Sequence, residues 1–272
     1  MTASAWLPIF REIAAEIRRQ IVPLAGTGRG RAVVGAGAGG DQTVFLDAAA
    51  EEIAVRHLEK AYRSGLRFQL VSEELGTRDF GGDALILVDP VDGSLNAKQG
   101  VPYYAVVLAM AGGPTLQDVE VALVWNLATG EEFSAQRSAG AFHDGRQIEP
   151  QALDPGDRYP LVQMDASRPL AAIDRVRQIV DHAERLRILG SVGLNLCYTA
   201  TGAIALTMAP LPMRAFDLAG PLLILREAGG VATDLEGGSL SRVPSDLSAR
   251  TTLLASASAA AHARALQLLG HR

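Results

Sequence analysis

Apolar residues recur along the chain with two different spacings, which predict helices and strands in turn. Phe10, Ile13, Ile17 and Ile21 follow one another every three or four positions, as on one face of a helix near the N-terminus. We also predict helices over residues 44–63, 170–186, 192–202, 216–230 and 259–270. Shorter apolar runs predict strands over 67–71, 84–88, 104–110, 118–126, 131–136, 161–165 and 251–256. Strands mixed with helices throughout a chain indicate a layered α/β or α+β fold.

Two segments rich in glycine and proline interrupt this pattern. Residues 26–43 carry many glycines and predict a mobile loop. Residues 144–160 combine glycine, proline and aspartate, which indicates a long connection between two halves of the chain. We therefore predict an N-terminal half over 1–150 and a C-terminal half over 151–272, joined as one compact unit.

Composition excludes several classes of protein. The chain of 272 residues is 48% hydrophobic and 20% charged, as in ordinary soluble proteins. Its net charge of −5 argues against a nucleic-acid surface, and its first helix mixes charges in a way that argues against membrane binding. A single cysteine, Cys197, allows no internal disulfide, and no signal peptide precedes the first helix, so we expect a cytoplasmic protein.

The most informative stretch follows the strand at 84–88, where Asp89 and Asp92 stand three residues apart around Pro90. Two carboxylates in one crevice repel each other unless one is protonated or a cation lies between them. Oxygen ligands without a nearby histidine or cysteine favour Mg²⁺, Mn²⁺ or Ca²⁺ over zinc. The sequence thus predicts a divalent cation site, although an ordinary Asp-rich turn with helix capping explains the same residues.

The residues beside the two aspartates suit a phosphate ester. The carbonyl of Val91 offers a further oxygen ligand, and Gly93 lets the backbone approach a ligand closely. The amides of Gly93 and Ser94 can then face a phosphate group, with the Ser94 hydroxyl beside the cations.

Four segments carry a resemblance to a known family. VSEELG (71–76), LILVDPVDGSLNAKQGVPYYAVVLAM (85–110), GSVGLNLCYTATG (190–202) and FDLAGPLLILREAGG (216–230) together resemble the inositol monophosphatase family of magnesium-dependent, lithium-sensitive phosphatases. The resemblance covers roughly residues 40 to 235 in the family's order. It implies a sugar-phosphatase fold, an α+β sandwich of layers α-β-α-β-α with the site between the two halves, and a homodimer.

The resemblance also assigns roles to single residues. It implies that two or three Mg²⁺ ions, or Mn²⁺ in their place, are bound by Glu73, Asp89, the Val91 carbonyl, Asp92 and Asp217. Glu74 is the alternative to Glu73.

Substrate and water have their own residues in the same resemblance. Gly93, Ser94, Val192 and Asp217 would contact the substrate, and Asp47 with Ser94 would activate a water, with Glu73 also in a catalytic role.

The chain departs from animal-type members of the family at several positions. Phe216 replaces a tryptophan, and Pro210 stands where those members carry an acidic residue that binds inositol hydroxyls. The motifs resemble archaeal-type members that hydrolyse inositol monophosphate and fructose 1,6-bisphosphate. Those members have an aspartate in the glycine-rich loop near the third metal, where this chain has Gly39 with Asp41 two residues away.

We therefore predict a Mg²⁺-dependent phosphomonoesterase that acts on a small polyol or sugar phosphate. Its substrate would be of the inositol 1-phosphate or fructose 1,6-bisphosphate type. The alternatives are a phosphatase of histidinol phosphate or adenosine 3′,5′-bisphosphate, and a regulatory binding protein on the same fold. A dinucleotide-binding oxidoreductase is a weaker rival: Gly35, Gly37 and Gly40 match its fingerprint, but no acidic residue ends a strand about 20 residues later.

Several other residues carry two interpretations. Arg168 and Arg214 could hold a second phosphate or a sugar hydroxyl, or could be ordinary surface charges. Cys197 is expected to be a packed small hydrophobe rather than a nucleophile. His57, His143 and His182 lack ligand-like spacing and are expected to be surface residues or hydrogen-bonded ones.

Overall fold

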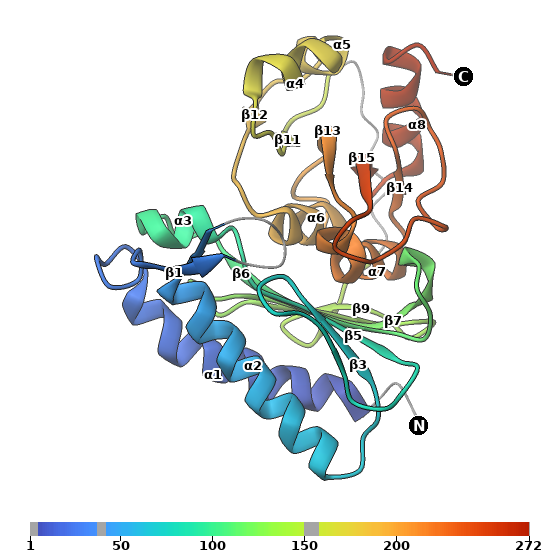
Figure 1. Cartoon of the computed structure of the whole chain (residues 1–272). Coiled ribbons are helices and arrows are strands. Elements are labelled where there is room, and N and C mark those ends of the chain that lie inside the picture. Colours follow the sequence, from blue (N-terminus) through green and yellow to red (C-terminus); the bar gives the residue numbers. More distant parts are fainter. Residues whose placement is uncertain (1–4, 37–41, 150–157, 272) are drawn as a thin grey trace.

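Five layers of helix and sheet are stacked in the computed structural model of the chain, which describes residues 5–36, 42–149 and 158–271. Figure 1 shows α1 and α2 below a large sheet, α6 and α7 above that sheet, then a second sheet, and finally α4, α5 and α8. This arrangement confirms the predicted α+β sandwich. Separate hydrophobic clusters fill the space on each side of the two sheets.

The first helix pair covers one face of the large sheet. Helix α1 (Trp6–Ile21) buries the predicted stripe, and Phe10, Ile13, Ile17 and Ile21 are all 0% exposed. Helix α2 (Phe45–Arg63) lies beside α1 and packs on strand β5. Burying large apolar side chains in this way is the main favourable contribution to folding.

The large sheet has eight strands in the order β10-β9-β8-β7-β6-β5-β3-β4, all antiparallel except the β3–β5 pair. Its strands are β3 (Gln69–Ser72), β4 (Gly76–Asp79), β5 (Leu85–Asp92), β6 (Ala105–Ala111), β7 (Val119–Asn126), β8 (Glu132–Gln136), β9 (Gly140–His143) and β10 (Arg146–Gln147). Helix α3 (Ser94–Gln99) connects β5 to β6. Because β5 is an interior strand and is buried, its carboxyl end carries Asp89 and Asp92 into the interior.

The second sheet has five strands in the order β12-β11-β13-β15-β14. They are β11 (Val162–Met164), β12 (Leu186–Arg187), β13 (Leu206–Arg214), β14 (Val231–Thr233) and β15 (Arg250–Ser256). Helices α6 (Val192–Ala200) and α7 (Ala219–Glu227) lie between the two sheets, and α4 (Pro169–Arg175), α5 (Arg177–Asp181) and α8 (Ala259–Leu268) cover the outer face. The short turn η4 (Phe216–Leu218) leads from β13 into α7 and carries Asp217.

Three segments differ from the sequence-based predictions. Strand β13 was not predicted because Pro210 and Pro212 lie within it, and the structure places both where its pairing with β15 is irregular. The single helix predicted over 170–186 is broken at Val176, whose backbone (φ −123°, ψ 23°) leaves the helical region. Its last residue, Leu186, instead begins β12, which pairs with β11.

The glycine-rich segment is also more ordered than predicted. Strands β1 (Val33–Ala36) and β2 (Gln42–Val44) pair antiparallel within the predicted loop. A dinucleotide fingerprint requires a parallel strand that turns directly into a helix, so this antiparallel pair argues against it. Gly37, Gly39, Gly40 and Asp41 lie outside the described residues.

The predicted boundary between the halves lies at residues 150–157, outside the described residues, and stays a prediction. The large sheet takes its strands from before this segment and the second sheet from after it. Among the helices of the described residues, every one is too short or too polar to cross a lipid bilayer.

Candidate active site

Two of the predicted ligands lie where β5 ends. Asp89 and Asp92 are only 4% and 8% exposed, and the pairing of β5 with β6 is irregular between them. The backbone turns at Gly93, whose φ of +84° favours glycine, and helix α3 begins at the next residue. A Cβ on Gly93 would stand 2.9 Å from the carbonyl oxygen of Gly190. Glycine is therefore required here for both backbone conformation and space.

Asp92 links the end of β5 to the start of α6, a hundred residues later. Its Oδ2 accepts hydrogen bonds from Ser191 Oγ (2.5 Å) and the Gly193 amide (2.8 Å), and its Oδ1 accepts one from the Val192 amide (3.2 Å). A carboxylate is stabilised at the N-terminus of a helix by exposed amides and the helix dipole. Asp92 thus fixes where α6 begins, and the structure brings the predicted residue Val192 beside it.

Glu73 and Asp217 are brought together by a residue that lies between them, Arg214. Nη2 of Arg214 is 2.5 Å from Glu73 Oε1, and its Nε is 3.2 Å from Asp217 Oδ2. All three side chains are largely buried, with 13 to 18% of each exposed. Among the described residues, Oδ1 of Asp217 and Nη1 of Arg214 are buried without a hydrogen-bond partner. The pocket therefore contains polar atoms whose bonding capacity is unused.

The four predicted carboxylates act on one another electrostatically. Burial, followed by the charges of Glu73, Asp92 and Asp217, raises the pKa of Asp89 well above its usual range. Burial also raises the pKa of Asp217 to about 7, although Arg214 opposes the rise. It raises the pKa of Asp92 to about 6, against the hydrogen bonds from Ser191 and Gly193. The site thus holds more negative charge than its single arginine balances.

Asp47 lies in the first turn of α2, 4% exposed. Its Oδ2 is 3.7 Å from Nζ of Lys98 on α3, and its Oδ1 is buried without a hydrogen-bond partner among the described residues. Burial raises the pKa of Asp47 to about 7; Lys98 lowers it, and the charges of Glu74 and Glu73 raise it further. Asp47 therefore belongs to the same acidic region as the four carboxylates.

The donor set fits hard divalent cations. Glu73, Asp89, the Val91 carbonyl, Asp92 and Asp217 offer only oxygen atoms, and Asp217 Oδ1 has no other partner. In the part of the chain that the structure describes, no three acidic, histidine or cysteine side chains yet converge on a common point for an ion. Arg214 holds Glu73 and Asp217 in ion pairs instead. These residues would hold a cation after a local rearrangement of side chains.

A cavity of about 430 Å³ opens beside Asp217 and Arg214, which is enough for a small phosphate ester. Its lining includes Asp165, Ser167, Met213, Arg214, Asp217 and Arg250. Arg214 and Asp217 face both the cavity and the acidic cluster, so a ligand in the cavity lies next to the proposed ions.

The remaining predicted residues occupy varied places. The amide of Val91 donates a hydrogen bond to Asp89 Oδ1 (3.1 Å), and Val91 is buried. Glu74, the alternative to Glu73, instead accepts a hydrogen bond from Thr43. Arg168 is exposed at the start of α4 and does not line the cavity.

The histidines and the cysteine agree with their non-catalytic interpretations. His57 Nε2 lies 2.7 Å from Glu16 Oε2, and His182 Nδ1 lies 2.7 Å from the Gln178 carbonyl oxygen. Cys197 is fully buried, and burial raises the pKa of its thiol.

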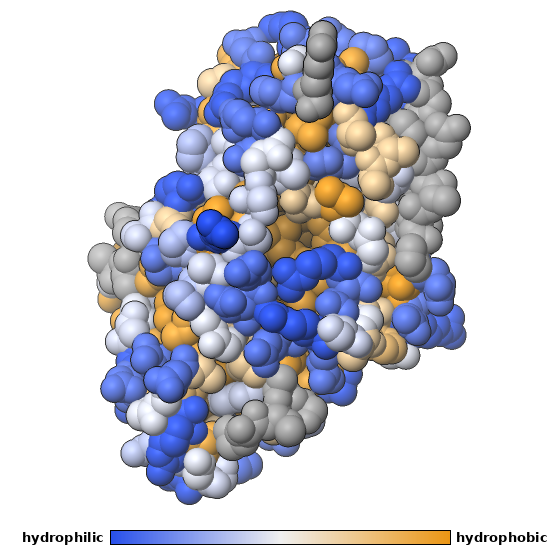
Figure 2. Space-filling view, turned by 90° about the vertical axis from the view of Figure 1, so that its right-hand side faces the viewer, coloured by the Kyte–Doolittle hydropathy of each residue, from blue (hydrophilic) through white to orange (hydrophobic). Residues whose placement is uncertain are grey.

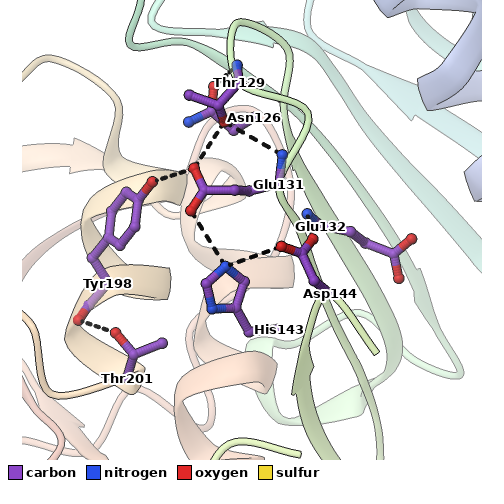
Figure 3. A network of polar contacts seen from close by, with 8 residues as sticks. All are labelled: Asn126, Thr129, Glu131, Glu132, His143, Asp144, Tyr198 and Thr201. Carbon is purple, nitrogen blue, oxygen red and sulfur yellow. Dashed lines mark hydrogen bonds and ion pairs between the residues drawn. The ribbon is translucent and has the colours of Figure 1, made fainter. Parts of the chain in front are cut away.

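His143 takes part in a polar network between the large sheet and α6, shown in Figure 3. Its Nε2 is 3.3 Å from Glu131 Oε1 and 3.7 Å from Asp144 Oδ2, and its ring stacks on Phe133. The Tyr198 hydroxyl donates a hydrogen bond of 2.8 Å to Glu131 Oε2. This network holds α6 on the sheet, and among the described residues it makes no hydrogen bond or ion pair with Glu73, Asp89, Asp92 or Asp217.

A second hollow lies on the face shown in Figure 2, where apolar side chains line a depression bordered by hydrophilic ones. A second cavity, of about 280 Å³, has a lining that includes Leu116, Leu222, Leu225, Arg226, Val231 and Leu240. None of the predicted site residues lines it. Its apolar lining does not suit a doubly charged phosphate.

Sequence reasoning missed two parts of the site. Lys98 was not considered, although it stands four residues after Ser94, one helical turn away. Arg214 was considered either a ligand of a phosphate or sugar hydroxyl or a surface charge, and its ion pair with Glu73, 141 positions away, has no local signal. Its spacing of three residues from Asp217 could have indicated that contact.

Comparisons with known proteins find relatives that match almost the whole chain. The family described as the inositol monophosphatase family matches residues 11–271. The chain is 33% identical to the fructose-1,6-bisphosphatase/inositol-1-monophosphatase of Archaeoglobus fulgidus, over 97% of each protein. It is 31% identical to the protein of the same name from Methanothermobacter thermautotrophicus, over 97% of this chain and 96% of that protein.

A further relative and a solved structure complete the comparison. The bifunctional NADP phosphatase/NAD kinase of Methanococcus maripaludis is 32% identical over 83% of this chain and 42% of its own length. The crystal structure of an inositol monophosphatase–fructose 1,6-bisphosphatase superposes with a TM-score of 0.84 at 27% identity, covering 97% of this chain and 99% of that one.

Proposed function

The chain belongs to the inositol monophosphatase family and is a phosphatase of phosphate monoesters, and from this premise we propose that it hydrolyses small polyol or sugar phosphates with Mg²⁺. Inositol 1-phosphate and fructose 1,6-bisphosphate are the substrates that fit the names of its archaeal relatives. We propose two or three Mg²⁺ ions, replaceable by Mn²⁺, and inhibition by Li⁺.

One observation carries the proposal: the carboxylates of Glu73 just after β3, Asp89 and Asp92 on β5 and Asp217 in η4 act on one another electrostatically beside a cavity, with negative charge in excess. The raised pKa values of Asp89, Asp92 and Asp217 express that excess. An excess of buried negative charge is costly in a metal-free protein and is relieved by divalent cations. When bound, such ions stabilise charge on the phosphate oxygens and make water more acidic.

The protein's own groups then position the reactants. The phosphate lies against the amides of Gly93 and Ser94 at the start of α3, and Val192 and Asp217 border the substrate. In the active form, an unprotonated Asp47 would accept a hydrogen bond from the Ser94 hydroxyl and so orient the attacking water. Lys98 favours the charged form of Asp47. Because Ser94 orients water, we propose direct hydrolysis without a phosphorylated enzyme.

The identity of the substrate is a separate proposal. Pro210 supplies no acidic group for inositol hydroxyls, and its carbonyl accepts a hydrogen bond from Arg175 Nη1 (2.7 Å). This favours a sugar phosphate over inositol 1-phosphate. Histidinol phosphate and adenosine 3′,5′-bisphosphate remain alternatives, as does a regulatory binding role, and the relative in Methanococcus maripaludis adds NADP.

A phosphate-release panel tests the proposal. It compares fructose 1,6-bisphosphate, inositol 1-phosphate, histidinol phosphate, glycerol 2-phosphate, adenosine 3′,5′-bisphosphate and NADP, each with Mg²⁺, with Mg²⁺ plus Li⁺, and with EDTA. We expect Mg²⁺-dependent release from the first two and none in EDTA. Release from no ester under any condition would favour a binding protein, and equal release in EDTA would refute the cation site.

The remaining proposals concern the protein in the cell. We propose a cytoplasmic homodimer whose partner is a small phosphate ester rather than nucleic acid or membrane. Light scattering on the purified chain measures its mass directly, and a mass of about 28.7 kDa, that of one chain, would refute the dimer.

A further inference from the structure

Arg214 occupies the position where a cation is needed. It ends β13, and its guanidinium contacts Glu73 through Nη2 and Asp217 through Nε. Burial alone would lower the pKa of Arg214, but the negative charges of Asp217, Glu73 and Asp89 together outweigh it and raise that pKa. One guanidinium thus offsets carboxylates that arrive from three separate segments.

A carboxylate oxygen that accepts a hydrogen bond from arginine is less available to coordinate a metal ion. Oε1 of Glu73 and Oδ2 of Asp217 already accept hydrogen bonds from Arg214, and an ion at the site would need these carboxylates as ligands. Arginine stays charged at any pH relevant to proteins, so it cannot withdraw by losing a proton. Two positive charges between the same carboxylates would repel each other strongly.

We propose that Arg214 is a built-in counter-cation that competes with divalent metal for Glu73 and Asp217 and moves away when metal binds. This inference rests on the proposed metal-dependent function. It assigns Arg214 a positioning role: it keeps the acidic site folded in the absence of metal and sets a threshold concentration for metal binding.

The structure provides space for that movement. Arg214 borders the 430 Å³ cavity, whose lining also includes Asp165 as an alternative anionic partner. Nη1 of Arg214 is buried without a hydrogen-bond partner among the described residues, so part of the guanidinium is free to bond elsewhere. A guanidinium turned into the cavity faces the place where an anionic substrate would lie, and metal and substrate binding then favour each other.

Metal binding measured without turnover tests the competition. Mn²⁺ is titrated calorimetrically into metal-free wild-type protein and into the variants Arg214→Ala, Arg214→Lys and Arg250→Ala. We expect Arg214→Ala to bind Mn²⁺ about ten times more tightly than the wild type, a gain of about 1.4 kcal/mol. Arg214→Lys cannot contact two carboxylates in the same fork geometry. Its Mn²⁺ affinity should therefore lie between those of the wild type and Arg214→Ala.

Arg250→Ala is the matched control, because Arg250 lines the same cavity and contacts backbone carbonyl oxygens rather than the carboxylates. Its Mn²⁺ affinity should stay within about twofold of the wild type, since only a distant, screened charge is lost. Added guanidinium ion at about 20 mM, far below the molar concentrations that denature proteins, provides a second control. It should weaken Mn²⁺ binding in Arg214→Ala and leave the wild type unchanged.

The possible outcomes separate the competition from the proposed metal site. Unchanged or weaker binding in Arg214→Ala, or equal tightening in Arg250→Ala, would overturn the competition while Mn²⁺ binding by the wild type still supported the phosphatase site. Retained Mn²⁺ binding in Asp217→Asn would overturn the ligand assignment itself. A lack of Mn²⁺ binding by every protein would overturn both the proposed function and this inference.

Discussion

The amide of Gly193 donates a hydrogen bond of 2.8 Å to Oδ2 of Asp92, and the space around Gly193 leaves no room for a side chain. A Cβ on Gly193 would lie 2.7 Å from that oxygen and 2.9 Å from Cγ2 of Val107. This contact joins the carboxyl end of β5 to the N-terminus of α6. The position of a proposed metal ligand thus depends on a helix from the other half of the chain.

Replacing Gly193 with alanine should displace Asp92. Alanine favours helices by about 1 kcal/mol over glycine, but overpacking typically costs 1–3 kcal/mol, so we expect a net loss of about 1 kcal/mol in the free energy of unfolding. Because the neighbours of a metal ligand hold it in place, kcat/KM should fall about tenfold or more. Urea unfolding and phosphate release measure the two effects.

Gly28→Ala is the control for that substitution, since a Cβ at Gly28 meets no atom within 4 Å among the described residues. Its stability and activity should stay close to those of the wild type. Equal behaviour of the two variants would show that the contact between Gly193 and Asp92 does not matter.

The stability of the metal-free protein should fall as pH rises, because buried acids must ionise. The pKa of Asp47 is raised from 3.8 to about 7 in the folded protein. Between these values the folded state binds more protons than the unfolded state, so the free energy of unfolding decreases with pH. The variant Asp47→Asn lacks this contribution, which is of the order of a few kcal/mol.

Urea unfolding in EDTA at pH 5 and pH 8 measures the difference. Asp47→Asn should lose less stability than the wild type over this range, yet it should have little phosphatase activity. An Asn variant with the same pH dependence as the wild type would mean that Asp47 is already ionised in the folded protein.

A histidine far from the site should give the opposite pH dependence. His262 on α8 is 4% exposed, its Nε2 is 3.1 Å from Thr233 Oγ1, and burial lowers its pKa below the usual 6.5. The unfolded state therefore binds the extra proton first, and stability falls as pH drops below 6.5. His262→Gln should remove this fall in unfolding experiments between pH 5 and 7; an unchanged slope would assign the fall to other groups.

The network in Figure 3 should contribute to stability but not to catalysis. Tyr198→Phe removes the hydrogen bond to Glu131 and should cost about 1 kcal/mol of unfolding free energy. Tyr62→Phe, at a residue 40% exposed, is the control and should be nearly neutral. A large loss of kcat in Tyr198→Phe with unchanged stability would contradict the separation of this network from the active site.

Local patterns predicted the frame of the molecule because they record which face of each element is buried. The stripe on α1 and the apolar run of β5 were both predicted from spacing. Strand β13 was missed, since Pro210 and Pro212 are poor residues for a paired strand and only an irregular pairing accommodates them. The break at Val176 separates α4 from α5, and the spacing of apolar residues gives no sign of it.

Part of the candidate site could also be predicted from the sequence. Asp89 and Asp92 were visible because they stand at the end of an apolar run. Glu73 and Asp217 were assigned to one cation site through family resemblance, which gave no sign that both would pair with Arg214. The contact between Arg214 and Glu73 joins β13 to the end of β3 and could not be predicted from either segment alone.

The most direct test of the cation site is anomalous X-ray diffraction from crystals of the protein grown with Mn²⁺. We predict manganese peaks within about 2.0–2.3 Å of carboxylate oxygens of Asp89 and Asp217, with the guanidinium of Arg214 moved off Glu73. Crystals in which Mn²⁺ lies elsewhere, while Arg214 still bridges Glu73 and Asp217, would contradict it.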